Sequence, residues 1–284
     1  PYIGVKDIPL DSLSKKKWSE KSQKSKLKAF DIASEILEAE AKRNLEESQK
    51  VSLNLSEYEK FCDTFKFTET PDQERVIREV IADLLSDKPQ DRLICGEVGF
   101  GKTEVALRAS FIVAQNDYQV CILAPTTVLA KQHFEVFKER FSEFPYRICL
   151  LTREQTKTEK AEIYKKIKEN HFSIIIGTHA LFNKEISFKS LNLLIIDEEH
   201  KFGVRQKEQI RSLKNGINVI SLSATPIPRT LNLSLSKVRD ISLITTPPTG
   251  RKSVKTIVSR YSKSLVFEAI QREFYRDGQV FYLL

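Results

Sequence analysis

A glycine-rich segment at residues 96–103 has the composition of a phosphate-binding loop. It reads Gly-Glu-Val-Gly-Phe-Gly-Lys-Thr and lies between an apolar run and a helical pattern. Glycines let backbone N–H groups close around phosphate oxygens, and the start of the helix adds a partial positive charge. Lys102 would reach the β- and γ-phosphates of ATP, and the Thr103 hydroxyl would bind Mg²⁺. The expected nucleotide-binding residues of this loop are Gly96, Glu97, Val98, Gly99, Phe100, Gly101, Lys102 and Thr103.

Two acids, Asp197 and Glu198, stand at the end of a second apolar run. A buried strand that delivers acids at its carboxyl end is where parallel-sheet proteins place ligands. Asp197 would hold Mg²⁺ through water, and Glu198 would orient and deprotonate the attacking water. Acids at a strand end are often only polar exits from the core, but these follow a phosphate loop. Lys102, Asp197 and Glu198 are therefore the expected catalytic residues, and Thr103 and Asp197 the expected metal ligands.

Gln73 has two interpretations. It ends the segment Thr-Pro-Asp-Gln, a good helix start in which Thr70 is the N-cap and Gln73 closes a capping box. Its amide also matches the donor and acceptor pattern of adenine. Phe65 and Phe67, just upstream, could stack on the base. Because the phosphate loop follows, we favour a role for Gln73 in binding adenine.

Further polar residues follow the ends of apolar runs, where hydroxyls and backbone amides can hold phosphates. Each one taken singly is more often a turn or capping residue. The candidates for DNA contacts are Thr126, Thr127, Thr178, His179 and Arg229. The candidates for a relay between the ATP site and nucleic acid are Ser223, Thr225 and His200.

The elements that must position these residues form a regular alternation. Apolar runs predict strands at 92–95, 119–124, 147–151, 173–176, 193–196 and 218–222, with helices between most of them, for example at 102–115 and 128–140. Near-continuous apolar strands that alternate with helices indicate a parallel sheet covered on both faces, an α/β fold. Beyond Pro247 and Pro248, a strand at 254–258, a helix around 265–275 and a strand at 279–284 would begin a second α/β unit.

The segment before the sheet predicts one long helix at 13–49, because it has no Gly or Pro and its apolar residues recur every three or four positions. The first half of this helix is strongly basic, which suits either a solvated face or a contact to DNA or an acidic protein.

Composition is compatible with a polyanionic partner. The chain has 284 residues and a formal net charge of +8, although many ordinary enzymes are basic too. Its four scattered cysteines have no zinc-site spacing and suit a reduced, cytoplasmic protein. We expect no membrane span and no signal peptide. The chain contains no methionine, and we expect it to be a piece of a longer protein.

Six motifs stand in the order found in superfamily 2 helicases: Thr-Pro-Asp-Gln (70–73), the loop through Ala106, Ala-Pro-Thr-Thr-Val-Leu-Ala (124–130), Gly-Thr-His (177–179), Asp-Glu-Glu-His-Lys-Phe-Gly-Val (197–204) and Ser-Ala-Thr-Pro-Ile-Pro-Arg-Thr-Leu (223–231). From about residue 10 onward the chain resembles the bacterial transcription-repair coupling factors. The nearest competing resemblance is to the RecG branch-migration helicases, which share the Thr-Pro-Ile-Pro-Arg-Thr segment. Lys201 stands where relatives often have arginine.

The resemblance implies a RecA-like P-loop lobe at 51–248, preceded by a relay helix at 13–50 and the tail of a polymerase-interacting module at 1–12, and followed by the start of a second lobe at 249–284. It implies an ATP-driven translocase on double-stranded DNA that displaces stalled RNA polymerase and recruits an excision-repair damage-recognition protein through other parts of the parent protein. The family's arginine-bearing motif would lie beyond residue 284, so this chain alone should be almost inactive. The alternatives are fork remodelling of the RecG kind and a non-catalytic adaptor that binds DNA or polymerase.

Overall fold

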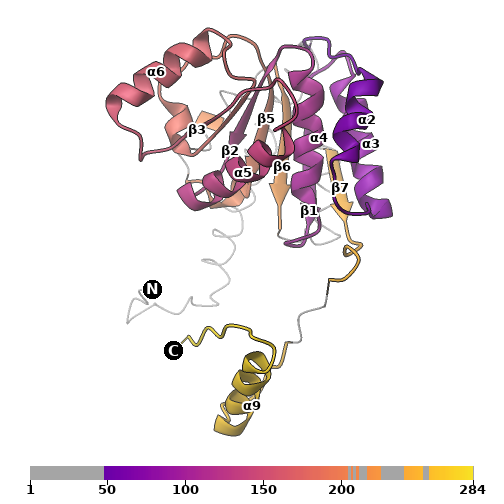
Figure 1. The fold of residues 1–284 in the computed structure, drawn as a ribbon, viewed down its shortest axis with the longest axis vertical. Coiled ribbons are helices and arrows are strands. Elements are labelled where there is room, and N and C mark those ends of the chain that lie inside the picture. The colour runs from indigo at the N-terminus through magenta and orange to yellow at the C-terminus, as the bar shows by residue number, and fades with distance from the viewer. Residues whose placement is uncertain are drawn as a thin grey trace, which may run out of the picture. The chain divides into compact units, whose positions relative to one another are not determined.

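The computed structural model describes residues 48–203, 206, 209–210, 216–224, 240–251 and 256–283. The chain divides into two compact units between Thr249 and Gly250. The first unit is built on a seven-stranded parallel sheet with the strand order β3-β4-β2-β5-β6-β1-β7 (Figure 1). Its strands are β1 (Asp91–Gly96), β2 (Gln119–Leu123), β3 (Ile148–Leu151), β4 (Ile174–Gly177), β5 (Leu191–Asp197), β6 (Asn218–Ser223) and β7 (Asp240–Ile244).

Two helices precede the first strand, and the others lie between strands along the chain. They are α2 (Leu55–Asp63), α3 (Pro71–Leu84), α4 (Lys102–Ala114), α5 (Thr127–Arg140) and α6 (Lys157–Lys168), with the short 3₁₀ helices η1 (His179–Phe182) and η2 (Glu199–Lys201). The six predicted strands and the helices at 102–115 and 128–140 are confirmed with boundary shifts of one or two residues. The predicted fold class, a RecA-like parallel sheet with helices, is also confirmed.

Alternate residues of the strands pack into two separate hydrophobic cores, one on each face of the sheet. On one face, side chains such as Ile122 of β2 and Ile195 of β5 pack with helices α2 to α5. On the other face, their neighbours Cys121 and Ile196 pack with α6, η1 and Phe202. Because both faces are covered, the central strands are apolar along their length, which is the pattern that made them visible in the sequence.

Helix α4 is buried on all sides from Glu104 to Ala114. It packs against β1, β2 and β5 on one side and against α2 and α3 on the other. The ends of several helices are fixed by side-chain caps: Thr70 and Gln73 form the predicted capping box of α3, and Thr126 accepts a hydrogen bond from the Leu129 N–H at the start of α5.

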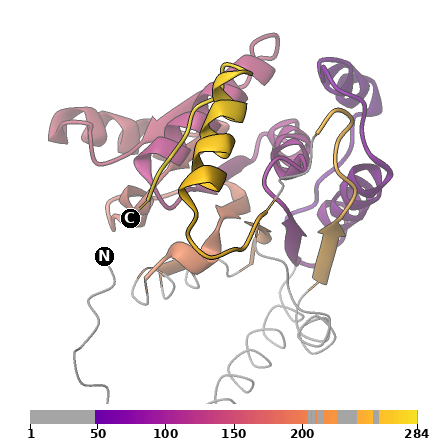
Figure 2. The ribbon, with the colours of Figure 1, turned by 90° about the horizontal axis from the view of Figure 1, so that it is seen from below.

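The edge strand β7 was not predicted, and it pairs with β1 in parallel (Figure 2). Its run Asp-Ile-Ser-Leu-Ile alternates polar and apolar residues, and its pairing is held by side chains from elsewhere in the fold. Arg92 of β1 donates to the Ser242 hydroxyl (2.9 Å). Just past the strand, Thr245 and Thr246 donate backbone and side-chain hydrogen bonds to Asp72, which hold the pKa of that carboxyl well below its usual range.

Residues 1–47, which include most of the predicted relay helix and the upstream tail, lie outside the described residues. The extension of that helix to residue 50 is wrong, because residues 48–50 are not helical. The backbone of Ser48 donates to Asp87 O (2.9 Å), and Asn192 donates to Gln49 O (3.2 Å), so these groups bond to the sheet domain instead of to a helical turn.

In the second unit, α9 (Lys263–Phe274) confirms the helix predicted around 265–275. The strands predicted beside it are wrong where they are described. Residues 256–258 and 279–283 form no strand, and residues 252–255 and 284 lie outside the described part. A strand is stabilised by pairing with a neighbour, and the described residues of this unit provide none.

Candidate functional site

The phosphate loop and the acids meet at one edge of the sheet. The loop follows β1, the acids follow β5, and Ser223 ends β6, which lies between those two strands. Parallel strands direct their carboxyl ends to the same edge, and neighbouring strands lie about 4.8 Å apart. The ends of β1 and β5 are therefore separated by about 10 Å, a span that a phosphate chain and its metal ion can bridge.

The loop between β1 and α4 has the backbone that a phosphate cradle requires. Gly99 and Gly101 have φ values of 82° and 80°, a region that favours glycine. A side chain on Gly101 would also collide with the Gln73 amide at 2.3 Å. Lys102 reaches back across the loop, and its ammonium donates to Gly96 O (2.5 Å) and Glu97 O (3.0 Å). Two carbonyls at the start of the loop thus hold the lysine ammonium.

Gln73 is a structural partner of this loop. Its side-chain oxygen accepts from the Thr70 N–H (2.9 Å), and its side-chain nitrogen donates to Phe100 O (2.8 Å). The residue is only 3% exposed. Both ends of the amide are therefore engaged within the protein, and Gln73 ties the start of α3 to the phosphate loop.

The two aromatic candidates differ in their surroundings. Phe65 is partly buried and has the guanidinium groups of Arg108 and Arg140 at 5.9 and 5.6 Å from its ring centre. Phe67 packs edge-on against Phe65 with 5.6 Å between ring centres, and it is 74% exposed. Of the two, Phe67 has the open ring face.

Asp197 has a partner that the sequence did not reveal. The Nε2 atom of His133, on α5, lies 3.0 Å from Asp197 Oδ2. Both side chains are nearly buried, 12% and 14% exposed.

Glu198 links the acids to the next motif. Its φ of 51° places it in the left-handed region, and its N–H donates to Leu222 O (2.8 Å) at the end of β6. Its side-chain oxygens accept from the Ala224 N–H (2.8 Å) and lie 3.2 Å from His200 Nδ1. The carboxylate is therefore held in place by the segment that follows β6.

A buried ionic network lies directly behind the phosphate loop. Glu104, the residue after Thr103, pairs with Arg108 (2.9 Å) and with Arg140 at the end of α5 (2.8 Å). Arg108 also pairs with Glu69. The Glu104 and Arg108 side chains are 4% and 6% exposed. This network fixes α5 to the helix that carries the phosphate loop.

The described candidates for nucleic-acid contact lie at the same edge of the sheet, but one of them, Thr178, is buried. Thr126 and Thr127 begin α5, and the exposed His179 begins η1. Thr178 is 2% exposed, and its hydroxyl is buried without a hydrogen-bond partner in the described part of the chain. A direct phosphate contact by that hydroxyl does not fit this structure. Arg229 and Thr225 lie outside the described residues.

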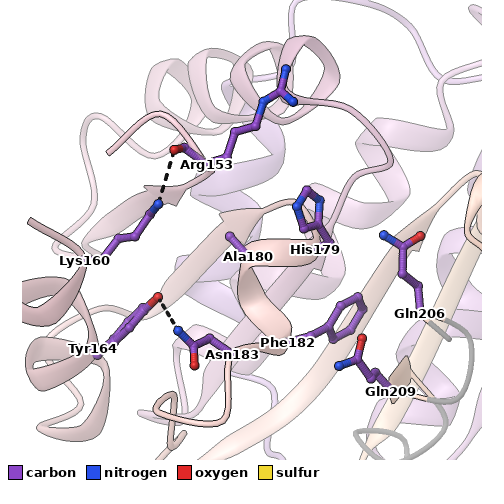
Figure 3. A pocket seen from close by; sticks show the side chains of 9 residues that line it. All are labelled: Arg153, Lys160, Tyr164, His179, Ala180, Phe182, Asn183, Gln206 and Gln209. Atoms are coloured by element: carbon purple, nitrogen blue, oxygen red, sulfur yellow. Dashed lines mark hydrogen bonds between the residues drawn. The ribbon is translucent and has the colours of Figure 1, made fainter. Parts of the chain in front are cut away.

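An open pocket of about 430 Å³ lies beside His179 (Figure 3). Lys160 and Tyr164 of α6 line one side, Gln206 and Gln209 line the other, and His179 stands between them. Arg153, which follows β3, also lines it, together with Ala180, Phe182 and Asn183. The lining combines positive charge with amide groups, which are donors suited to phosphate oxygens.

Residues 70–233 match the family model described as DEAD/DEAH box helicase. The chain belongs to this family. It is also similar to three curated bacterial proteins named transcription-repair-coupling factor. The Escherichia coli relative is 45% identical over 98% of this chain and 24% of its own length, and that of Haemophilus influenzae is 46% identical over 99% and 25%. The Bacillus subtilis relative is 44% identical over 99% and 24%. The chain therefore spans about a quarter of the length of these relatives.

Among solved structures, RecG bound to a three-way DNA junction is 33% identical, with a TM-score of 0.72 over 84% of this chain and 32% of that one. The helicase MrfA shares the fold, with a TM-score of 0.54 over 80% of this chain and 37% of that one at 14% identity. The family and its fold establish this chain as a nucleotide-binding helicase domain.

The donor set of this helicase domain fits magnesium. Mg²⁺ is usually held by one or two carboxylates together with substrate phosphates and water, and not by a complete protein cage. Thr103 and Asp197 offer hard oxygen donors at the phosphate edge, and the described residues contain no cluster of three or more metal-ligating side chains. None of the helices in the described part of the chain is long and apolar enough to cross a membrane.

Several candidate residues at this edge were not predicted from the sequence. Arg153 meets the same criterion as the predicted DNA contacts, since it follows the end of β3, whereas Lys160 lies within α6. His133 and Arg140 are polar residues seven positions apart on the inward face of α5, which is a weak but usable signal. Ala224 acts through its backbone N–H, so its side chain carries no signal.

Proposed function

We propose that this helicase domain is part of an ATP-driven translocase on double-stranded DNA that removes stalled RNA polymerase, with an excision-repair damage-recognition protein as a further partner. The supporting observation is the intact catalytic edge: Lys102 on the phosphate loop, Asp197 on β5, and Glu198 hydrogen-bonded to Ala224 of the following motif. The relatives at about 45% identity carry the matching name.

In this proposal each group has a separate task. Lys102 and the loop N–H groups bind the β- and γ-phosphates of ATP, while Thr103 and Asp197 would hold Mg²⁺, which neutralises charge on those phosphates. Glu198 accepts a proton from the attacking water. Because the Ala224 N–H donates to the same carboxylate, movement of the segment after β6 would change the position of the base. Ser223, Thr225 and His200 would belong to the relay between this ATP site and nucleic acid.

The base-recognition side of the site is assigned to Phe67 and Gln73. The exposed ring of Phe67 offers a stacking surface for adenine, and Phe65 packs edge-on against it. Gln73 would read adenine by exchanging a hydrogen bond that it now makes to Thr70 N or Phe100 O. The same exchange of hydrogen bonds would couple adenine binding to the conformation of the phosphate loop.

DNA would lie along the edge marked by Thr126, Thr127 and His179. The pocket lined by Arg153 and Lys160 continues this line past the end of β3. We assign phosphate contacts to these side chains, because phosphate contacts position a protein on DNA without reading its sequence. Such contacts suit a motor that must track along any sequence.

The function is tested with the full-length protein and a transcription complex stalled by nucleotide starvation. ATP should release the RNA polymerase, while ADP and a non-hydrolysable ATP analogue should not. The alternative, fork remodelling of the RecG kind, is favoured by the 33% identity to RecG on a three-way junction. Efficient branch migration of a junction without release of polymerase would decide for that alternative.

Replacement of Arg153 by alanine should weaken DNA binding by full-length protein equally for unrelated sequences. One phosphate contact fewer should also reduce the slope of log affinity against log salt by about 1. The measurement is fluorescence anisotropy with two duplexes of different sequence over a salt series. Arg147→Ala is the matched control, because Arg147 precedes β3 at the opposite end of the strand and contacts His171. Equal salt slopes for the wild type and Arg153→Ala would remove this residue from the DNA site.

A further inference from the structure

Helix α5 contributes two inward-facing polar side chains to the catalytic edge. His133 and Arg140 are seven residues apart, which places them on the same face of a helix. Phe137, between them, is fully buried. Arg140 is anchored by Glu104 (2.8 Å) and by Phe61 O (3.2 Å). The helix that carries His133 is therefore anchored at its carboxyl end.

The contact between His133 and Asp197 has a defined polarity. An ionised carboxylate can only accept hydrogen bonds, so His133 Nε2 must carry the hydrogen that points to Asp197 Oδ2. Carboxylates that hold metal ions are commonly oriented by a second hydrogen bond of this kind. The donor leaves the other carboxylate oxygen, Oδ1, for the metal or its water.

We infer that His133 is a positioning residue for Asp197, one that fixes the carboxylate in the orientation needed to bind Mg²⁺ with the nucleotide. This inference rests on the proposed role of Asp197 as a metal-binding acid. Its alternative is a structural role, in which His133 only fills space between α5 and β5. A structural role predicts a change in stability without a change in metal dependence.

The test measures binding of a fluorescent ADP to full-length protein, once with EDTA and once over a magnesium titration. His133→Ala should leave the metal-free affinity unchanged and raise the magnesium concentration for half-maximal enhancement by about 10-fold or more, because partners that orient a ligand typically contribute 10–100-fold. His133→Gln, whose amide nitrogen can reach the Nε2 position, should restore most of the magnesium affinity. Glu135→Ala, an exposed position on the same helix, is the control.

Asp197→Asn separates the inference from the proposed function. If Asp197→Asn loses the magnesium response and His133→Ala keeps a wild-type response, the positioning role is overturned. If Asp197→Asn itself responds as the wild type does, the metal assignment fails and this inference with it. Should His133→Ala not fold, His133→Gln is compared with His133→Asn, whose amide falls short of Asp197. Wild-type magnesium titrations for both would overturn the inference.

Discussion

Replacement of Glu198 by glutamine should reduce ATP turnover by full-length protein about 10²–10⁴-fold, the usual contribution of proton transfer. Glutamine keeps an oxygen that can accept the Ala224 N–H bond, so the loop geometry should survive. It cannot accept a proton from water at neutral pH. Nucleotide affinity should stay close to that of the wild type, because the phosphates are held by the loop and Lys102. Steady-state hydrolysis and binding of fluorescent ADP measure the two quantities separately.

The matched control is Glu199→Gln, which changes the adjacent carboxylate. Glu199 accepts from the Ser221 hydroxyl (3.1 Å) and has no part in the proposed proton transfer. ATP turnover by Glu199→Gln should remain within a few-fold of that of the wild type. Unchanged hydrolysis by Glu198→Gln would show that another group activates the water.

The second large effect concerns stability. Glu104→Ala should destabilise the first unit by about 3–5 kcal/mol, because removal of the shared carboxylate takes away the acidic partner of the buried Arg140 guanidinium and leaves Arg108 with Glu69 alone. Alanine is the best helix former, so loss of helix propensity cannot account for the effect. At about 2–4 °C per kcal/mol for a domain of this size, the unfolding midpoint should fall by roughly 10 °C. Circular dichroism during thermal and urea unfolding of this chain checks the prediction.

Glu162→Ala provides the comparison. Glu162 is also on a helix and pairs with Lys166 four residues later, but that pair is exposed to solvent. Exposed ion pairs contribute little to stability, so this variant should unfold close to the wild type. Similar losses of stability in the two variants would show that burial is not the reason why the Glu104 network stabilises the protein.

Much of this protein follows from local sequence. The phosphate loop and the α3 cap are contained in short segments in which residue type dictates backbone conformation, as with the φ values of Gly99 and Gly101. The six predicted strands were visible because both faces of the sheet are covered, so each strand is a continuous apolar run. Parallel pairing then brings the carboxyl ends of those strands to one edge, which places Asp197 and Glu198 near Lys102.

The hydrogen-bond partners of these residues were decided only by the tertiary structure. β7 is an edge strand whose Ser242 is bonded by Arg92, and Asp72 bonds the threonines just past the strand. Both partners are far away in the sequence, so the local pattern of β7 is weak. His133 reaches Asp197 across 64 residues, and Glu198 bonds to the Ala224 backbone. A residue's type and local period determine its conformation and burial. The identity of its hydrogen-bond partner depends on the strand order and the register of a parallel sheet, and both are set by contacts between segments distant in the chain.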